Sequence, residues 1–476
     1  MMSINKIKHI HMIAICGTAM GSLAAMLKSK GYKITGSDAN VYPPMSTFLE
    51  EQGIPIFNGF SEENLNPNPD LVIIGNAMSR GNPEVEYVLA NKIPYTSSAA
   101  ALKEFFIAGK HSIVVSGTHG KTTTSSLLAW TMEKNHKKPG FMIGGIPLNF
   151  NQGFKIDEGD IFIVEGDEYD TAFFDKAAKF FHYMPDTLIV NNIEFDHADI
   201  YNDLDQIILA FRRLVNLVPG NGLFLACNDD SHVRDLTQYA FSKVETFGLA
   251  PGSIWRADNI IYNSNETIFD VLYHGQHFAN FKIPLSGDHS VRNALATIGT
   301  CHFHGISPHG IQDAFSTFKS VKKRLEVKAI IKDIIIYDDF AHHPTEVNTT
   351  INGLRNQYPD RHIWAIFEPR TSTAKRKMME KLYTNAFDAA DSVIFAPIHL
   401  PKKVNKDELM SVQHVVEQLK SRNKNAHHFD TVNDIVDYTV SHVKPGDLIL
   451  IMSNGAFNGI HNSIIDNLTV KYDDEK

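Results

Sequence analysis

One stretch of the chain, from Ser112 to Trp130, most strongly limits what the sequence can fold into. The apolar run 112–115 leads into Ser-Gly-Thr-His-Gly-Lys-Thr-Thr-Thr at positions 116–124, and a helical pattern follows. This order of strand, glycine loop, lysine, hydroxyl residue and helix is typical of a phosphate-binding loop. Glycines let backbone N–H groups approach an anion, and the helix start adds free donors and a positive dipole end. The stretch therefore predicts an α/β domain that binds nucleotide phosphates.

Two side chains of this loop carry chemistry. We expect Lys121 to contact the outer phosphates and the Thr122 hydroxyl to bind Mg²⁺. The standard pattern G-x-x-x-x-G-K-[ST] requires glycine at position 115, where this chain has Val115, and the first glycine is Gly117. The shortened loop argues against ordinary GTPases and transport ATPases. A chance Gly-Lys-Thr at a helix start is the alternative, which the agreement of strand, loop and helix disfavours.

Length and charge narrow the class of protein. A chain of 476 residues allows about three domains of ~150 residues each. Its net charge of −9 gives no electrostatic support for a nucleic-acid partner. No segment approaches the ~18 consecutive apolar residues of a membrane span, and the stretch 1–9 lacks the apolar core of a signal peptide. Three scattered cysteines without a CxxC indicate a reducing compartment. We therefore expect a cytoplasmic protein without membrane insertion.

The first block of the chain, residues 1–108, predicts a βαβ unit. An apolar run at 9–15 reads as a strand, Gly17-Thr18-Ala19-Met20-Gly21 opens a helix, and a second strand ends at Asp38. An acid at this distance is typical of dinucleotide folds, but the loop is G-x-x-x-G and the NAD fingerprint is absent. Two interpretations stay open. The glycines allow tight packing of helix on strand, or a nucleotide diphosphate binds at the helix start with Asp38 on a ribose hydroxyl.

The second block, residues 109–318, places acidic clusters after two buried strands. The run 160–164 leads into Glu165-Gly166-Asp167-Glu168-Tyr169-Asp170, and the run 187–190 leads into Asn191-Asn192-Ile193-Glu194-Phe195-Asp196-His197. Parallel sheets bind ligands beyond the carboxyl ends of their strands. Because Mg²⁺ prefers carboxylate and phosphate oxygens, clusters beside a phosphate loop predict a magnesium site. Each carboxylate taken alone is more typical of a solvated loop.

The third block, residues 319–476, repeats this arrangement. We expect paired strands at 328–331 and 334–337, and further strands at 363–367 and 447–452. Polar motifs follow these strands, among them Asp339, Arg370 and the glycine-rich turn 453–459. His342-His343 suggests a metal site, but without a matching carboxylate spacing a hydrogen-bonding loop pair is favoured.

These motifs, in this order and over essentially the whole chain, resemble the Mur ligases, which form amide bonds on UDP-linked muropeptides using ATP. The resemblance implies an α/β fold of three domains. They are an N-terminal Rossmann-like UDP-binding domain at 1–108, a central P-loop ATPase-type domain at 109–318 and a C-terminal Rossmann-like peptide domain at 319–476. Residues 287–294 are similar to the family's adenine motif, and residues 322–326 resemble its basic hinge.

The resemblance also implies roles for individual residues. The implied cofactors are ATP and Mg²⁺, with Lys121, Glu168 and His197 catalytic and Thr122, Glu168 and His197 as metal ligands. The implied ATP-binding residues are Gly117, Thr118, His119, Gly120, Lys121, Thr122, Thr123, Asn293, Arg324 and Asp339. The implied UDP-sugar residues are Gly17, Thr18, Gly21, Asp38 and Asn76. The implied peptide-binding residues are Arg370, Asn454 and Gly455.

Within the family, the motifs at 36–46, 144–150, 165–175 and 367–370 are most similar to members that join a recycled tripeptide to UDP-N-acetylmuramate. We therefore expect the lactyl carboxylate to be activated by ATP as an acyl phosphate, which the amine of L-Ala-γ-D-Glu-meso-diaminopimelate then attacks. The alternatives are an alanine-adding ligase and a non-catalytic regulator that binds UDP-sugar and ATP. A folate-glutamylating ligase is less consistent with the first block.

The chain departs from the family pattern at three places. Ser290 replaces the first asparagine of the adenine motif, and Ser320 replaces the usual glycine before the hinge. Several relatives carry a carbamylated lysine some way after the magnesium histidine, whereas this chain has Leu-Ala-Phe-Arg-Arg at 209–213. We therefore expect no carbamate, and the ligands of a second magnesium stay undefined.

Overall fold

The structure is a computed structural model that describes residues 6–198, 200–263, 266–398 and 408–473. The first residues of the stretch 1–9, inspected above for a signal peptide, lie outside the described residues, as does residue 199. Within the described part, the chain forms two compact units. The first contains residues up to 193, 204–255 and 296–314, and the second contains 194–203, 256–295 and the residues from 315 onward.

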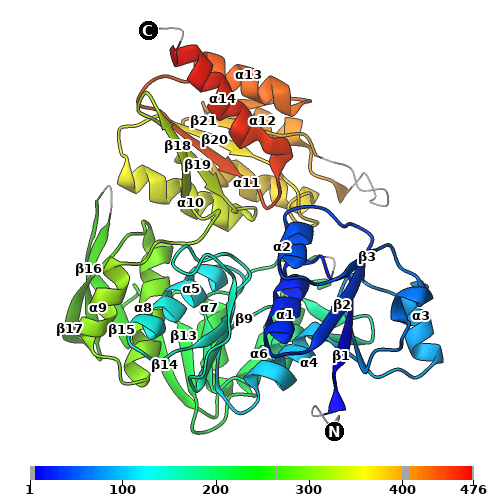
Figure 1. The fold of residues 1–476 in the computed structure, drawn as a ribbon. Helices are drawn as coiled ribbons and strands as arrows, with labels where there is room; N and C mark the ends of the chain where they lie inside the picture. The colour runs from blue at the N-terminus through cyan, green and yellow to red at the C-terminus, as the bar shows by residue number, and fades with distance from the viewer. Residues whose placement is uncertain (1–5, 199, 264–265, 399–407, 474–476) are drawn as a thin grey trace. The chain divides into compact units, whose positions relative to one another are not determined.

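The N-terminal part of the first unit is built on a five-stranded sheet in the order β3-β2-β1-β4-β5, with every pair parallel. Figure 1 labels β1, β2 and β3 of this sheet. Its elements are β1 (His9–Ile13), α1 (Thr18–Ser29), β2 (Lys33–Asp38), α2 (Met45–Glu51), β3 (Ile56–Asn58), β4 (Leu71–Ile74), α3 (Pro83–Ala90), β5 (Tyr95–Ser97) and α4 (Ser98–Leu102). The strand order reverses at β1, and open α/β sheets bind ligands beyond the carboxyl end of such a strand. The expected βαβ unit is therefore confirmed.

The rest of the first unit surrounds a second sheet, whose strands here run β14-β13-β12-β6-β9-β7-β8. Its elements are β6 (His111–Ser116), α5 (Lys121–Lys134), β7 (Gly140–Met142), β8 (Phe154–Lys155), β9 (Ile161–Gly166), β12 (Thr187–Val190), α6 (Leu204–Val215), β13 (Leu223–Cys227), α7 (Ser231–Leu236) and β14 (Lys243–Gly248). A small hairpin of β10 (Asp170–Ala172) and β11 (Asp175–Ala178) stands apart. Because β6 pairs with both β9 and β12, the ends of these three strands lie side by side.

The second unit contains a third sheet in the order β18-β19-β23-β20-β21-β22. Its elements are β18 (Glu326–Ile331), β19 (Ile334–Asp339), α10 (Pro344–Gln357), β20 (Ile363–Phe367), α11 (Glu380–Ala386), β21 (Ser392–Phe395), α12 (Val412–Ser421), β22 (Asn425–His428), α13 (Val432–His442), β23 (Leu448–Met452) and α14 (Ile460–Asp473). As expected, β18 and β19 are paired, and their pairing is antiparallel. The other neighbours in this sheet are parallel.

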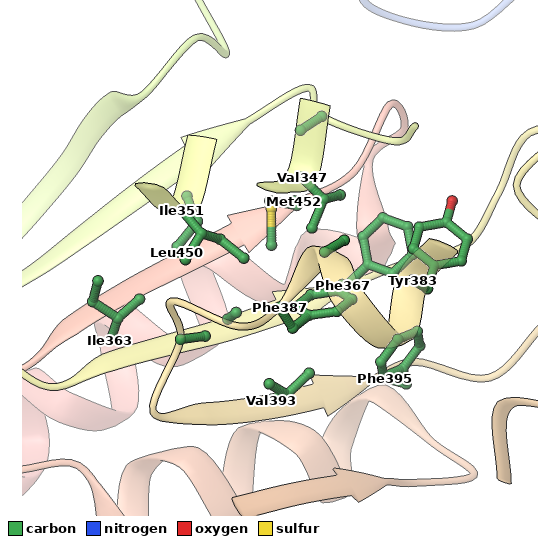
Figure 2. Packing of buried hydrophobic residues seen from close by; sticks show 14 of the residues in the cluster. Val347, Ile351, Ile363, Phe367, Tyr383, Phe387, Val393, Phe395, Leu450 and Met452 are labelled. Carbon is green, nitrogen blue, oxygen red and sulfur yellow. The ribbon is translucent and has the colours of Figure 1, made fainter. Parts of the chain in front are cut away.

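Helices cover both faces of this third sheet. One face packs apolar side chains of α10, α11 and α12 against β20, β21 and β23, and Figure 2 shows Phe367, Tyr383, Phe387 and Phe395 gathered there. The other face packs α13 and α14. Strands buried on both faces read as continuous apolar runs, which is why 363–367 and 448–452 could be recognised from the sequence.

Further segments complete the described chain. They are β15 (Trp255–Tyr262), the antiparallel pair β16 (Thr267–Tyr273) and β17 (Gln276–Ile283), α8 (Asp288–Phe303) and α9 (Pro308–Ser316). No helix within the described residues is both long enough and apolar enough to cross a membrane.

Candidate active site

The phosphate loop lies between β6 and α5, and the end of β12 holds its backbone. Gly117 has a φ of 127°, and a Cβ at this position would lie 3.0 Å from the carbonyl oxygen of Asn192 and 3.1 Å from its nitrogen. The Thr118 N–H donates to that carbonyl at 3.0 Å, and the His119 N–H donates to the Asn192 side chain at 2.8 Å. Gly120, with a φ of 82°, directly precedes the helix. Both loop glycines therefore occupy conformations that other residues rarely adopt.

The lysine of the loop is held by an ion pair. Lys121 Nζ donates to the Gly117 carbonyl at 2.6 Å and to Glu168 Oε2 at 3.1 Å. The Glu168 side chain is 1% exposed and that of Lys121 is 15% exposed. Burial alone lowers the pKa of Lys121, but the carboxylates of Glu168, Asp167 and Glu165 outweigh it and raise that pKa. The ammonium is therefore charged at neutral pH, as a phosphate ligand requires.

The hydroxyl of the loop contacts a different carboxylate. Thr122 Oγ1 donates to Glu165 Oε2 at 3.1 Å, and the other oxygen of Glu165 accepts the Gly144 N–H at 2.8 Å. Sequence analysis named Glu168 as a metal ligand, and that role stays a prediction. Glu165 is a further candidate that sequence analysis did not select. The parallel register of β6 and β9, which sequence patterns alone do not reveal, aligns Glu165 with Val115, directly before the loop.

The hydroxyl of Thr122 and the carboxylates of Glu165 and Glu168 fit a nucleotide-bound Mg²⁺. Mg²⁺ takes oxygen ligands and is commonly held by one or two carboxylates together with phosphates. The site also contains a charged lysine, the free N–H groups at the start of α5, and loop glycines where a side chain would not fit. These features suit the binding of a nucleoside triphosphate.

The first glycine loop, between β1 and α1, is built differently. Gly17 precedes α1 with an ordinary φ of −66°, and a Cβ there would meet no atom closer than 3.9 Å. Gly21 is buried within α1, where a Cβ would collide with the thioether of Met45. The packing interpretation therefore applies to Gly21, while the backbone around Gly17 and Thr18 stays open at the start of a twelve-residue helix.

The acid of this block has structural partners. Asp38 is 8% exposed; its Oδ2 accepts the Cys16 N–H at 2.9 Å and its Oδ1 accepts the Asn40 N–H at 2.9 Å. These bonds join the β1 loop to the residues after β2. Asn76 follows β4, and β1 lies between β4 and β2, the strand that Asp38 ends. The UDP-sugar role of these residues stays a prediction.

In the second unit, Asp339 ends β19 as a buried carboxylate. It accepts the backbone N–H groups of Leu325 and Ala341, each at 2.8 Å. Burial raises its pKa to about 6, although the positive charge of Arg324 and these two hydrogen bonds act in the opposite direction. Arg324 lies 3.6 Å from Glu346 and stacks over the Phe340 ring. The structure thus brings together the predicted nucleotide residues Arg324 and Asp339.

Asn293, the predicted adenine contact, is 5% exposed on α8. Three residues earlier, the Ser290 hydroxyl donates to the Ser286 carbonyl at 2.8 Å, and Ser286 Oγ donates to the Gly353 carbonyl at 3.0 Å. Ser290, which replaces an asparagine of the family pattern, therefore hydrogen-bonds the backbone just before this helix.

His197 lies in the second unit, in segment 194–203. Its φ is 54°, its N–H donates to Asp196 Oδ1 at 2.7 Å, and its Nε2 lies 4.0 Å from Asp196 Oδ2. Burial opposes ionisation of Asp196, but His197, His342 and His343 together lower its pKa. The metal role of His197 stays a prediction. The alternative is a structural histidine bonded to Asp196 or Asp199, and residue 199 lies outside the described residues.

The pair His342-His343 makes hydrogen bonds, as expected. His343 caps α10 by accepting the Thr345 N–H at 3.3 Å, with Glu346 completing the capping box. The His342 ring bonds the Phe340 carbonyl at 3.1 Å.

The predicted peptide residues meet at the ends of β20 and β23. A Cβ on Gly455 would force the Arg370 guanidinium to move, so this guanidinium packs against the glycine backbone. The Arg370 side chain is 49% exposed. Asn454 Oδ1 is buried and has no hydrogen-bond partner among the described residues. The site therefore offers an accessible cation beside an unused acceptor.

Comparisons with known proteins identify the family. Residues 9–109 match the model "Mur ligase family, catalytic domain", 115–301 match "Mur ligase middle domain", and 323–455 match "Mur ligase, glutamate ligase domain". The chain belongs to the Mur ligase family. The three-domain α/β fold expected from the sequence is thereby confirmed, and the protein is an ATP-dependent ligase.

Three relatives define its place in the family. The UDP-N-acetylmuramate–L-alanyl-γ-D-glutamyl-meso-2,6-diaminoheptandioate ligase of Haemophilus influenzae is 42% identical, over 98% of this chain and 100% of its own. The UDP-N-acetylmuramate–L-alanine ligase of Acetivibrio thermocellus is 34% identical, over 95% of this chain and 94% of its own. The crystal structure of a murein peptide ligase from Psychrobacter arcticus matches with a TM-score of 0.71 and 35% identity, over 97% of this chain and 98% of that chain.

Proposed function

We propose that this protein joins the tripeptide L-Ala-γ-D-Glu-meso-diaminopimelate to UDP-N-acetylmuramate, with ATP as the energy source. The observation that carries the proposal is the 42% identity, along nearly the whole chain, to a ligase of that name. Such a reaction reuses peptide released from the cell wall. Its place is the cytoplasm, where ATP and UDP-sugars are found.

The first step requires a carboxylate to attack the γ-phosphate of ATP, which brings two anions together. Catalysis then depends on positioning and on charge neutralisation. Lys121 supplies a fixed cation, because its ammonium is held between the Gly117 carbonyl and Glu168. The backbone N–H groups at the start of α5 supply further donors. The product of this step is an acyl phosphate of the lactyl group.

Mg²⁺, when bound, would neutralise phosphate charge, held by Thr122 together with Glu165 and Glu168, and by His197 as a further ligand. The contact between Thr122 and Glu165 supports this choice: a hydroxyl that donates its proton to Glu165 keeps its lone pairs available for a cation. The adenosine would lie on Asn293, Arg324 and Asp339. We assign the UDP-sugar to Gly17, Thr18, Gly21, Asp38 and Asn76.

In the second step, the tripeptide amine attacks the acyl phosphate and phosphate leaves. The peptide carries several carboxylates, so its site needs cations and N–H donors. Arg370, half exposed beside Gly455, can bind a carboxylate through two parallel hydrogen bonds. Asn454, with an unused acceptor oxygen, can take an N–H group of the peptide.

The experiment is an ADP-release assay with UDP-N-acetylmuramate and a panel of amines. We expect activity with L-Ala-γ-D-Glu-meso-diaminopimelate and little with free L-alanine. A preference for L-alanine would replace the proposal with an alanine-adding ligase, which the 34% identity to such an enzyme makes the second candidate. Binding of both nucleotides without ADP release for any amine would indicate a non-catalytic regulator.

A further inference from the structure

Glu368, to which no role has been assigned above, lies at the centre of the predicted peptide site. Parallel register pairs Phe367 with Met452, so Glu368 and Ser453 follow their strands side by side. The Glu368 N–H donates to the Met452 carbonyl at 3.0 Å, and the Ser453 hydroxyl donates to Glu368 Oε2. Glu368 is 3% exposed and Ser453 is 1% exposed. A carboxylate is therefore held at a fixed position in a largely water-free place.

A buried carboxylate is costly unless positive charge compensates it. Arg370 Nη1 lies 3.8 Å from Glu368 Oε1. Burial and the charge of Arg370 lower the pKa of the neighbouring Lys375, and the charge of Glu368 raises it. Glu368 thus offsets the repulsion between two cations that would otherwise push each other apart.

The contact with Glu368 leaves most of the Arg370 guanidinium available. A guanidinium has five N–H donors in a fixed plane, and the 3.8 Å distance between Arg370 Nη1 and Glu368 Oε1 is longer than a hydrogen bond. One side of the group packs against Gly455, while about half of the side chain is exposed. Glu368 and the Gly455 backbone therefore both lie against this guanidinium, while part of the side chain stays accessible.

Hydrogen bonds also connect Glu368 to the turn that follows β23. The Gly455 N–H donates to Ser453 Oγ at 2.9 Å, so one hydroxyl joins the carboxylate to the turn. Lys323 Nζ donates to the Gly455 carbonyl at 2.8 Å. The Lys323 carbonyl in turn accepts the Phe340 N–H at 2.8 Å, directly after Asp339. One hydrogen-bonded network therefore links Glu368, Ser453, Gly455 and Lys323.

We propose that Glu368 is a positioning residue, which orients Arg370 toward a carboxylate of the incoming peptide and thereby sets the preference for carboxylate-bearing amines. The inference rests on the function proposed above and deepens it. Glu368 does not itself contact the reacting atoms. Loss of its charge frees Arg370 to rotate, while the folded domain keeps the Ser453 hydrogen bond through an amide oxygen.

The test compares Glu368→Gln with the wild-type enzyme in full steady-state kinetics. We expect the KM for the tripeptide to rise about tenfold, the loss typical of one hydrogen bond to a charged group, with kcat and the KM values for ATP and UDP-N-acetylmuramate little changed. A second substrate, the tripeptide amidated at its diaminopimelate carboxylates, measures discrimination directly. The wild-type enzyme should prefer the acid form, and Glu368→Gln should lose most of that preference.

Four further variants separate positioning from a structural role. Arg370→Ala should lose the preference, and adding Glu368→Gln to it should cause no further loss, because the carboxylate then has no guanidinium to orient. Ser453→Ala should show a smaller rise in the same KM. Glu417→Gln, at an exposed glutamate on α12, is the matched control and should behave as wild type.

The inference is overturned by an unchanged tripeptide KM and unchanged discrimination in Glu368→Gln, or by an equal rise of all three KM values together with a lower melting temperature. Additive losses in the double variant would also contradict it. Failure of the proposed function is distinguishable, because the wild-type enzyme would then not release ADP with the tripeptide at all.

Discussion

Two loops of the first unit share one layout, a strand followed by glycines and a helix, yet they are built for different tasks. In the loop before α5, Gly117 and Gly120 both have positive φ, and the backbone of Asn192 lies where a side chain at Gly117 would be. In the loop before α1, Gly17 has an ordinary φ and open space around it, and Gly21 serves contact with α2.

The charges differ as clearly as the glycines. The loop before α5 holds a largely covered lysine near carboxylates, and its Thr122 hydroxyl donates to Glu165. The loop before α1 carries Cys16, and each carboxylate oxygen of Asp38 accepts one backbone N–H group. We infer that the loop before α5 is suited to metal-bound, reacting phosphates. The loop before α1 is suited to a diphosphate that binds without reacting. The predictions below test this division, from the largest expected effect to the smallest.

Replacing Lys121 should give the largest difference between the two loops, because it should affect ATP turnover and not UDP-sugar binding. We expect Lys121→Ala to lower ATP turnover by about 10²-fold or more, as for other preorganised charges. Binding of UDP-N-acetylmuramate, measured by calorimetry, should stay nearly unchanged. Lys134→Ala, an exposed lysine on the same helix, is the control. Normal ATP turnover in Lys121→Ala would remove the basis of the loop assignment.

Equivalent glycine substitutions should have unequal effects. Gly117→Ala requires a φ of 127° and a contact of 3.0 Å with Asn192, so we expect a loss of roughly 1–3 kcal/mol in stability and weak ATP binding. Gly17→Ala should leave the free energy of unfolding almost unchanged, since its Cβ has room. Urea unfolding of both variants measures the difference. Equal destabilisation would contradict the division.

Metal dependence should belong to one loop only. Chelation of Mg²⁺ should weaken ATP binding and leave UDP-N-acetylmuramate binding intact. Glu165→Gln and Glu168→Gln should each raise the Mg²⁺ concentration for half-maximal turnover, and a titration of Mg²⁺ in the ADP-release assay measures this. If only Glu165→Gln responds, the role of Glu168 is to hold Lys121, as its 3.1 Å contact suggests. Added bicarbonate should have no effect, because no lysine stands at 209–213.

The smallest effect concerns the thiol in the first loop. Burial, and secondarily the charge of Asp38, raise the pKa of Cys16 to about 11, because both disfavour the thiolate. We therefore expect slow alkylation by iodoacetamide at pH 8 and a steep rise in rate as the pH approaches 11, followed by peptide mass spectrometry. The buried Cys227 and Cys301 serve as internal references. Fast labelling of Cys16 at pH 7 would show that the loop is not held as described.

Much of this division could be predicted from the sequence, because it depends on local signals. The segment 116–124 carries its glycines, lysine and hydroxyl in one run. Continuous apolar runs marked β9, which contains Glu165, and β20, which ends at Phe367 shortly before Arg370. Chain order then sufficed to place polar residues at strand ends, since parallel strands share one edge.

The features that could not be predicted from the sequence depend on strand register and on contacts between residues far apart in the chain. The sequence offers Glu165 and Glu168 equally, and only the pairing of β6 with β9 puts Glu165 beside the Thr122 hydroxyl. The acid at 38 fits a ribose contact by spacing, but its oxygens accept backbone N–H groups. Likewise, nothing local shows that segment 194–203 joins the C-terminal part, where the Ala198 N–H meets Thr373.

The contact between Arg370 and Gly455 has a consequence for engineering. Any side chain at position 455 competes for the volume that the guanidinium fills, so the two positions cannot be varied independently. A library that randomises 455 alone would return mostly impaired clones, and one that shortens 370 alone would leave a void above the glycine. Directed evolution toward other amine substrates should treat the pair as a single locus and exchange volume between its two members.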